Sequence, residues 1–136
     1  MQASTAIERT LMLQDYLQLT RLVSQQQLHA GAEAMQELLD HSELVSLPEV
    51  PATLVTVHTE VLLEELASGR SYQLTLCYPR EARPAEGFVS VLSPVGASLL
   101  GLHVGAVARW RTPAGAEGAA RILAVLGRSA AEGERR

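Results

Sequence analysis

Histidine is the side chain of this sequence best suited to bind a metal ion or to move a proton near neutral pH. The chain has four of them, which are His29, His41, His58 and His103. None has a partner at the H-x-x-x-H spacing that places two imidazoles on one face of a helix. We therefore expect no metal site, and we assign none of these residues a catalytic role.

Three other groups of residues could do chemistry, but each has a simpler structural interpretation. Glu60, Glu64 and Glu65 could form an acid pair, although that spacing is more typical of the exposed face of an edge strand before a turn. Cys77 alternates with apolar residues and predicts a buried thiol; as the single cysteine, it excludes an intramolecular disulfide and a cysteine-based zinc site. Ser93 has no base near it in sequence and is explained by a helix start. The sequence therefore predicts a protein that is not an enzyme and has no cofactor.

Composition narrows the class of protein further. The 136 residues carry a net charge of −4, and all 11 basic residues are arginines scattered along the chain. Because a nucleic-acid binder usually gathers its basic residues into a stripe, we expect no direct nucleic-acid binding. No apolar run approaches the roughly 20 residues that span a bilayer, and residues 1–5 lack the charged and apolar start of a signal peptide. These features predict a cytoplasmic protein without a membrane partner.

Residues 1–46 have helical periodicity. Thr5 with Glu8 forms a capping-box start, and apolar residues then recur at helical spacing up to about Ser24. A second helix is expected over about 30–44. The short polar connection between the two predicts that they pair antiparallel as a helical hairpin. The hairpin is expected to be held together by an apolar stripe, which consists of Leu13, Leu17, Met35 and Leu39.

After Pro48 and Pro51 the period of the apolar residues changes from 3.6 to 2, which predicts strands. The expected strands cover residues 54–57, 61–66, 72–78, 88–92, 107–112 and 120–126. Residues 47–128 are therefore expected to form an α+β domain, with an antiparallel sheet and one short helix. Residues 129–136 are small and charged, and we expect a disordered tail there.

The expected short helix lies within residues 90–105. Ser93 can accept hydrogen bonds from the N–H groups that open a helix, and Pro94 follows where a missing N–H costs nothing. Leucines then supply a buried face, and Gly101 is suited to a C-terminal cap. This pattern predicts a strand that turns directly into one or two turns of apolar helix.

The same passage resembles the bacterial GreA/GreB transcription factors and their shortened relatives, the regulator of nucleoside diphosphate kinase (Rnk) family. Residues 93–105 match sequences of the SPVGAALLGLRVG type, and Trp110 followed by Pro113 resembles a W-x-x-P-G-G turn. The Pro-containing linker and strand over 47–57 are also similar, so the resemblance covers about residues 47–126. It implies an FKBP-like C-terminal domain, without isomerase activity, that binds RNA polymerase at the rim of the secondary channel.

The resemblance also implies which residues contact polymerase. In Gre factors the residues around the Ser-Pro turn contribute to binding, and the matching positions here are Leu92, Ser93 and Pro94. Leu92 occupies a position that is acidic in some Gre proteins, so this chain lacks that charge.

The N-terminal segment differs from the Gre pattern in a way that bears on activity. In cleavage-stimulating Gre proteins, acidic residues at the tip of a long coiled coil hold a magnesium ion, and a hard cation of this kind needs carboxylate oxygens. Here no Asp or Glu occurs from Thr20 to Ala32. We therefore expect a monomeric transcription regulator that competes with Gre factors for polymerase but does not stimulate transcript cleavage.

Two other functions fit the sequence. An FKBP-like fold could retain peptidyl-prolyl isomerase activity, but such a pocket is lined with aromatic residues and this chain has only one Phe, one Trp and three Tyr. Alternatively, the helical hairpin could be an adaptor that binds another protein or a second copy of itself. Rate enhancement on a proline peptide and a concentration-dependent mass would identify these two alternatives, respectively.

Overall fold

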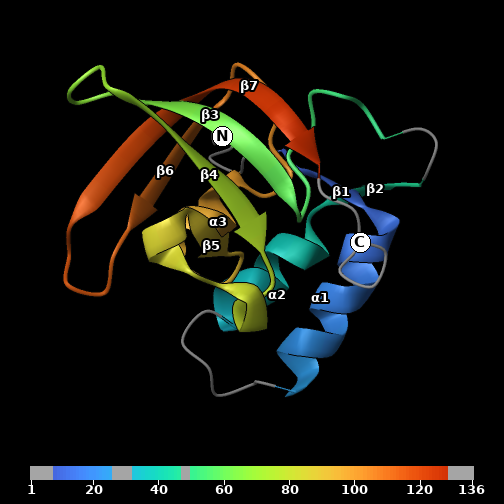
Figure 1. Ribbon diagram of the computed structural model, residues 1–136. Coiled ribbons are helices and arrows are strands. Elements are labelled where there is room, and N and C mark those ends of the chain that lie inside the picture. The colour runs from blue at the N-terminus through green and yellow to red at the C-terminus, as the bar shows by residue number, and fades with distance from the viewer. Residues whose placement is uncertain (1–7, 26–31, 47–49, 129–136) are drawn as a thin grey trace, which may run out of the picture.

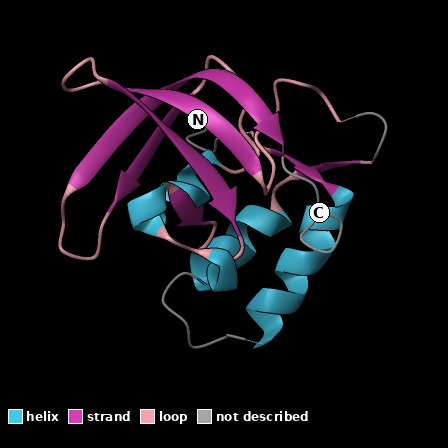
Figure 2. Ribbon diagram, viewed as in Figure 1, coloured by secondary structure: helices cyan, strands magenta, loops and turns pink. Residues whose placement is uncertain are grey.

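The computed structural model describes residues 8–25, 32–46 and 50–128 and has an α+β fold (Figure 1). The elements in chain order are β1 (Thr10–Met12), α1 (Leu13–Gln25), α2 (Ala32–Asp40), β2 (Glu43–Val45), β3 (Thr59–Glu65), β4 (Ser71–Cys77), η1 (Pro79–Glu81), η2 (Pro84–Glu86), β5 (Phe88–Ser90), α3 (Pro94–Leu99), β6 (Val107–Arg111) and β7 (Glu117–Arg128). The helices gather on one side of a curled sheet (Figure 2). Within the described residues, no helix is both long and apolar enough to cross a membrane.

The main sheet has five strands in the order β5-β4-β3-β7-β6. Its pairs are antiparallel except β4 and β5, which run parallel, so the expectation of a wholly antiparallel sheet is wrong. The two 3₁₀ turns η1 and η2 cause this difference, because they carry the chain back before β5 begins. The strand β3 lies at the centre of the sheet, which also corrects the placement of Glu60, Glu64 and Glu65 on an edge strand.

A second, two-stranded parallel sheet joins β1 to β2, and it changes the expected helix boundaries. The helix α1 begins at Leu13 rather than near Thr5, and α2 ends at Asp40 rather than Leu44. Long-range backbone bonds override the local helical pattern: the Thr10 N–H donates to the Gly101 carbonyl at 3.0 Å, and the Glu43 N–H donates to the Arg9 carbonyl at 2.9 Å. A predicted strand at 54–57 is also wrong: Leu54 forms an isolated bridge to His103, and Val55 bonds to the backbone of Leu102 and Gly101, but no strand forms there.

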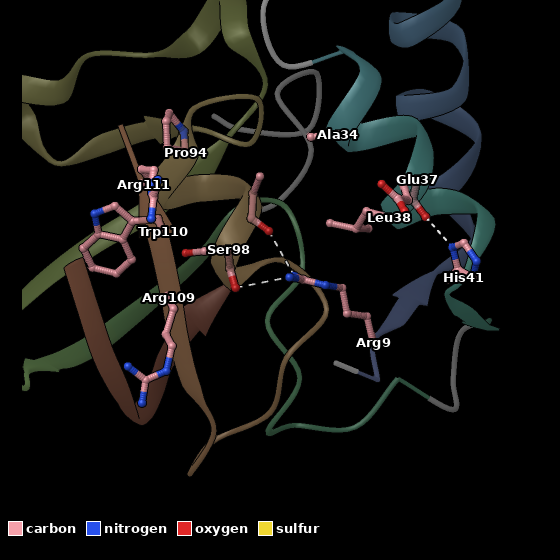
Figure 3. Close-up of a pocket in the computed structure, with 11 residues that line it drawn as sticks. Arg9, Ala34, Glu37, Leu38, His41, Pro94, Ser98, Arg109, Trp110 and Arg111 are labelled. Carbon is pink, nitrogen blue, oxygen red and sulfur yellow. Dashed lines mark hydrogen bonds between the residues drawn. The ribbon is translucent and has the colours of Figure 1, made fainter. Parts of the chain in front are cut away.

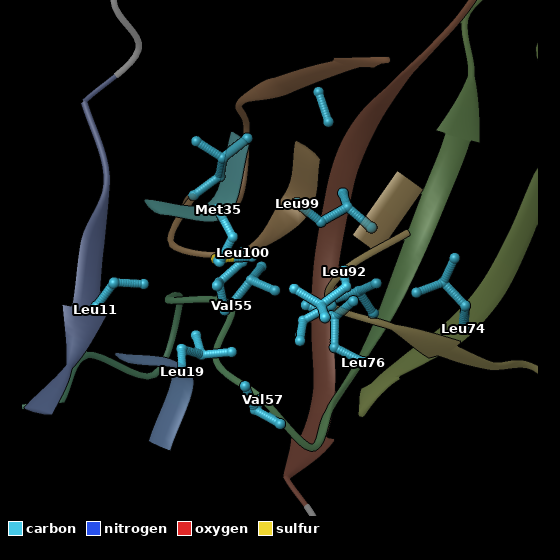
Figure 4. Close-up of a cluster of buried hydrophobic side chains, with 14 of the residues drawn as sticks. Leu11, Leu19, Met35, Val55, Val57, Leu74, Leu76, Leu92, Leu99 and Leu100 are labelled. Carbon is cyan, nitrogen blue, oxygen red and sulfur yellow. The ribbon is translucent and has the colours of Figure 1, made fainter. Parts of the chain in front are cut away.

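The core is shared between the helical pair, α1 and α2, and the sheet. Leu19 and Met35 from the helices are fully buried together with Val55, Leu76 and Leu100 from the rest of the chain (Figure 4). The four residues of the predicted apolar stripe are not all buried. Met35 and Leu39 are buried, whereas Leu13 and Leu17 are 37% and 56% exposed, so these two leucines do not hold the helices together.

Several expectations fall on residues outside the described ranges. They are the capping box at Thr5, the hairpin connection over 26–31, the linker over 47–49 and the tail over 129–136. The remaining strands after β3 lie within a few residues of their predicted positions, and Cys77 is buried as expected.

Candidate docking site

The Ser-Pro turn between β5 and α3 has the geometry of a helix N-terminus. Ser93 is the N-cap in extended conformation, and its Oγ accepts a hydrogen bond from the Gly96 N–H at 3.1 Å. The same hydroxyl donates to the Ser90 carbonyl at 2.7 Å, and Pro94 occupies the first helical position. The helix start predicted from the sequence is therefore confirmed, and both groups of the Ser93 hydroxyl are used to hold the turn.

Gly96 allows α3 to lie directly on the end of β5. A Cβ built on Gly96 would lie 1.9 Å from the Ser90 carbonyl oxygen and 3.0 Å from Cα of Val91. Since both of these atoms belong to the backbone, no side-chain rotation could relieve the overlap. Reasoning from the sequence missed this requirement, because Gly96 needs close approach and not an unusual φ angle.

The C-terminal end of α3 is held by Arg9, which comes just before β1. One guanidinium nitrogen, Nη1, donates to the carbonyls of Leu100 at 2.7 Å and Ala97 at 3.0 Å, and lies 3.4 Å from the Ser98 carbonyl. Burial lowers the pKa of Arg9. A positive charge at this end of a helix is favourable because the free carbonyls there carry partial negative charge. Sequence analysis did not single out Arg9, because its partners are 88 to 91 residues away.

Gly101 follows the end of α3 at φ +84°, in the left-handed conformation that glycine adopts without strain. A Cβ at this position would lie 3.0 Å from Cβ of Arg9 and 3.1 Å from the Thr10 carbonyl oxygen. The turn after α3 and the segment around β1 therefore pack directly against each other, which supports the predicted role of Gly101 in ending the helix.

The three residues expected to contact polymerase differ in how far they reach solvent. The Leu92 side chain is 7% exposed and belongs to the core. Ser93 is half-buried and Pro94 is exposed. Leu92 therefore packs beneath the turn, and Pro94 is the one of the three that is exposed to solvent.

A cavity of about 470 Å³ lies beside Pro94, with α2 on one side and α3 and β6 on the other (Figure 3). Its walls come from α2, α3 and β6, and its lining residues are Arg9, Ala34, Glu37, Leu38, His41, Pro94, Ala97, Ser98, Arg109, Trp110 and Arg111. Trp110 packs against Gly118 on β7, where a Cβ would lie 2.5 Å from the indole ring. We call this feature the α2–α3 groove. It combines apolar surface with three arginines against one glutamate.

On another side of the molecule, Asp15 in the first turn of α1 is 4% exposed. Its Oδ2 accepts a hydrogen bond from the Val57 N–H at 2.9 Å, and its Oδ1 accepts one from the Tyr78 hydroxyl at 3.3 Å. Burial raises the pKa of Asp15 to about 6, although these two bonds and the nearby His58 and Arg128 act in the opposite direction. The only acidic side chain of α1 therefore points into the protein interior.

Tyr78, the partner of Asp15, also contacts His58 and Glu81. His58 Nε2 lies 2.9 Å from Glu81 Oε1, which also accepts from the Tyr78 N–H at 3.0 Å. Burial acts to raise the pKa of Glu81, but the bonds from His58 and Tyr78 outweigh it and hold that pKa below its usual value. Among the described residues, no three His, Cys, Asp or Glu side chains are grouped to hold a metal ion.

Comparison with known proteins places this geometry in a family. Residues 50–126 match the family model for the C-terminal part of the transcription elongation factors GreA/GreB. The chain is 35% identical over 97 residues to the regulator of nucleoside diphosphate kinase of Escherichia coli K12, and this match covers 69% of the chain and 71% of that protein. It is also 29% identical over 91 residues to transcription elongation factor GreA of Chloroherpeton thalassium, covering 67% of the chain and 58% of that protein.

A solved structure agrees with the match in sequence. The prokaryotic transcription elongation factor GreA/GreB from Nitrosomonas europaea superimposes with a TM-score of 0.72 at 30% identity, over 86% of this chain and 98% of that one. The Ser-Pro turn, the α2–α3 groove and the helix end held by Arg9 all include residues of the matched region. The chain therefore belongs to the GreA/GreB family of transcription factors, and its relatives there include the regulator of nucleoside diphosphate kinase.

Proposed function

We propose that this protein binds RNA polymerase at the rim of the secondary channel and competes there with Gre factors. The observation that carries the proposal is the exposed Pro94, which is fixed on a capped helix start at the mouth of the α2–α3 groove. A proline presented on a rigid turn loses little conformational freedom when it is buried by a partner. Membership of the GreA/GreB family supports polymerase as that partner.

The α2–α3 groove supports the same assignment. Leu38 and Trp110 offer apolar surface, while Arg109 and Arg111 flank it with positive charge. Arg111 forms an ion pair with Glu117, and Arg109 is exposed and has no partner among the described residues. Aromatic and arginine side chains are the types that contribute most to binding energy in protein interfaces. We infer that a polymerase segment with an apolar and an acidic side chain docks in this groove.

We also propose that the protein does not stimulate transcript cleavage. With 13 residues, α1 is about 20 Å long at ~1.5 Å per residue. Its only carboxylate, Asp15, accepts two hydrogen bonds within the fold, and the sequence between Thr20 and Ala32 contains no acidic residue. The described end of α1, near Gln25, therefore offers no carboxylate that could carry a magnesium ion into a polymerase active site, and the first acidic residue of α2 is Glu33.

Residues 47–128 would then be an FKBP-like domain that binds polymerase and lacks isomerase activity. We further propose that the protein works as a monomer in the cytoplasm. The exposed Leu13 and Leu17, one helical turn apart on α1, make the oligomeric state worth measuring by light scattering. A mass that rises with concentration would favour the adaptor function instead.

Retention of the protein on immobilised core RNA polymerase tests the proposal. We expect retention at micromolar concentration, loss of it in Pro94→Ala, and no change in Pro113→Ala. Pro113 is a suitable control because it is also exposed but lies in the turn between β6 and β7. Absence of retention would contradict the proposal, and cleavage of nascent RNA in backtracked complexes would contradict the predicted lack of cleavage stimulation.

A further inference from the structure

A second cavity, of about 310 Å³, lies between α1 and the turn that follows β4. One wall is a single face of α1 and the other is the start of η1, and the lining residues are Gln18, Arg21, Leu22, Gln25, Tyr78, Pro79 and Arg80. The α1 residues recur at intervals of three and four positions, which places them on one side of the helix. We call this feature the α1–η1 pocket. None of its residues lines the α2–α3 groove.

The polar groups of the α1–η1 pocket are mainly hydrogen-bond donors. Arg21 and Arg80 bring two guanidinium groups from opposite walls, and Gln18 and Gln25 add two side-chain amides. No acidic side chain lines the pocket, although the chain as a whole carries a net charge of −4. The pocket is therefore a local concentration of positive charge in an acidic protein.

Two carboxylates lie on the same two elements, Asp15 on α1 and Glu81 in η1, and Glu81 also interacts electrostatically with Arg80. Asp15 is bonded to Val57 and Tyr78, and Glu81 is bonded to His58 and to the Tyr78 N–H. Arg21 is exposed and forms no hydrogen bond or ion pair with another described residue. The Arg21 guanidinium is thus available to an external anion.

The remaining walls of the α1–η1 pocket are apolar. Leu22 and Pro79 are half-buried, and the Tyr78 side chain, also half-buried, uses its hydroxyl to bond Asp15. A cavity of this volume with an apolar floor and a few converging polar groups is typical of small-molecule sites. Guanidinium groups match the oxygens of phosphate in charge and spacing, and a phosphate offers more acceptor oxygens than a carboxylate for donors on two walls.

We propose that the α1–η1 pocket binds a small phosphate-bearing anion. Its phosphate would lie between Arg21 and Arg80, with Gln18 and Gln25 donating to the same group. Such a ligand would bridge α1 and the sheet, because its two arginines belong to separate parts of the fold. Binding would therefore raise the melting temperature of the protein, since the ligand requires both walls in their folded positions.

Calorimetric titration and thermal unfolding at low ionic strength test this proposal with three probes: inorganic phosphate, pyrophosphate and a nucleoside triphosphate. We expect saturable binding and a higher melting temperature with at least one probe. Equal affinity for pyrophosphate and the nucleotide would show that the site recognises phosphate alone. Tighter binding of the nucleotide would show that the apolar wall around Tyr78 also contributes.

Two variants make the test specific to this pocket. Arg21→Gln and Arg80→Gln should each weaken binding by about tenfold, because each removes a charge-assisted contact. Arg70→Gln is the matched control, since Arg70 is exposed in the turn between β3 and β4, outside the pocket. Absence of binding of all three probes up to about 5 mM, or equal binding by all three variants, would overturn the proposal. Either result leaves the polymerase experiment unaffected, because Pro94 lies in the other groove.

Discussion

The N-terminal part of the chain contacts the rest of the fold at two places that use opposite charges. At the first, the Arg9 guanidinium donates to carbonyls at the end of α3. At the second, the Asp15 carboxylate accepts hydrogen bonds from the Val57 N–H and the Tyr78 hydroxyl. Both contacts join residues far apart in sequence; Arg9 is half-buried and Asp15 is buried.

The Arg9 contact and the Asp15 contact differ in how they respond to pH. Arginine stays protonated between pH 4 and pH 8, so the charge of the contact at α3 does not change over that range. Asp15, by contrast, has a pKa raised to about 6 because burial penalises its charged form. The comparison teaches that the contact at α3 keeps its charge as the pH changes, while the Asp15 contact loses stabilisation as the carboxylate ionises. Four substitutions, from the largest expected effect to the smallest, test this contrast.

Substitution of Gly96, in α3, should have the largest effect. Gly96→Ala places a Cβ 1.9 Å from the Ser90 carbonyl oxygen, so α3 must move away from β5. We expect a loss of at least about 3 kcal/mol in the free energy of unfolding, measured by urea denaturation. Gly127→Ala is the control, because a Cβ there meets no atom within 4 Å. Equal stability of the two variants would contradict the close packing of α3.

Asp15→Asn should stabilise the protein at neutral pH. The folded-state pKa of about 6 lies above the ordinary value of 3.8, so the stability linked to Asp15 is fully present below about pH 4 and is lost as the pH rises through 6. The loss amounts to up to about 3 kcal/mol, at 1.36 kcal/mol per pKa unit. An amide keeps an acceptor for Val57 and is never charged.

Urea denaturation between pH 4 and pH 8 measures this effect. The wild-type protein should become less stable across the range relative to Asp15→Asn, whereas the exposed control Glu86→Gln should follow the wild type. Asp15→Leu leaves the Val57 N–H without its partner and should destabilise the protein at every pH. If the stability of wild type and of Asp15→Asn depends on pH in the same way, ionisation of Asp15 does not destabilise the protein.

Arg9→Ala removes the guanidinium that donates hydrogen bonds at the end of α3. It leaves the carbonyls of Ala97 and Leu100 without this donor, and we expect a loss of about 2 kcal/mol that does not change between pH 5 and pH 8. Arg121→Ala, at an exposed position on β7, should change stability by less than about 0.5 kcal/mol. If the loss of unfolding free energy in Arg9→Ala depended on pH, the Arg9 and Asp15 contacts would no longer differ in their response to pH.

Ser93→Ala should have the smallest effect, about 1 kcal/mol, because it removes an N-cap from a helix that is also held by packing. Ser93→Thr keeps the hydroxyl that accepts from Gly96 and donates to Ser90, so it should recover most of the loss. Chemical denaturation of the three proteins provides the comparison. If Thr is no better than Ala, the hydroxyl does not cap α3.

The same two regions show what could be predicted from the sequence. The sheet strands and the α3 start were predictable because their signals are local: alternation of apolar residues, turn glycines, and Ser-Pro at a helix start. The boundaries of the helical pair were not, because β1 and β2 have three residues each and exist only through bonds to distant segments. Three-residue strands carry too little pattern to outweigh a helical period.

The Arg9 and Asp15 contacts could not be predicted from the local sequence pattern either. Asp15 on a helix is an ordinary surface residue by type, and its burial depends on Val57 and Tyr78, which are 42 and 63 residues away. Leu13 and Leu17 fitted an apolar stripe, yet α1 is rotated so that Asp15, Leu19 and Val23 face inward. Which face of a short helix is buried depends on the surface that it packs against, and that surface is formed by residues distant in sequence.

The central claim, that the Pro94 side of the molecule docks where Gre factors dock, is tested most directly by competition. Fluorescently labelled GreA bound to core RNA polymerase is titrated with this protein, and displacement is followed by anisotropy. We predict full displacement by the wild type and by Pro113→Ala, and displacement weakened by about tenfold or more in Pro94→Ala. No displacement at a saturating concentration of the wild type, or equal displacement by the two proline variants, would contradict the claim.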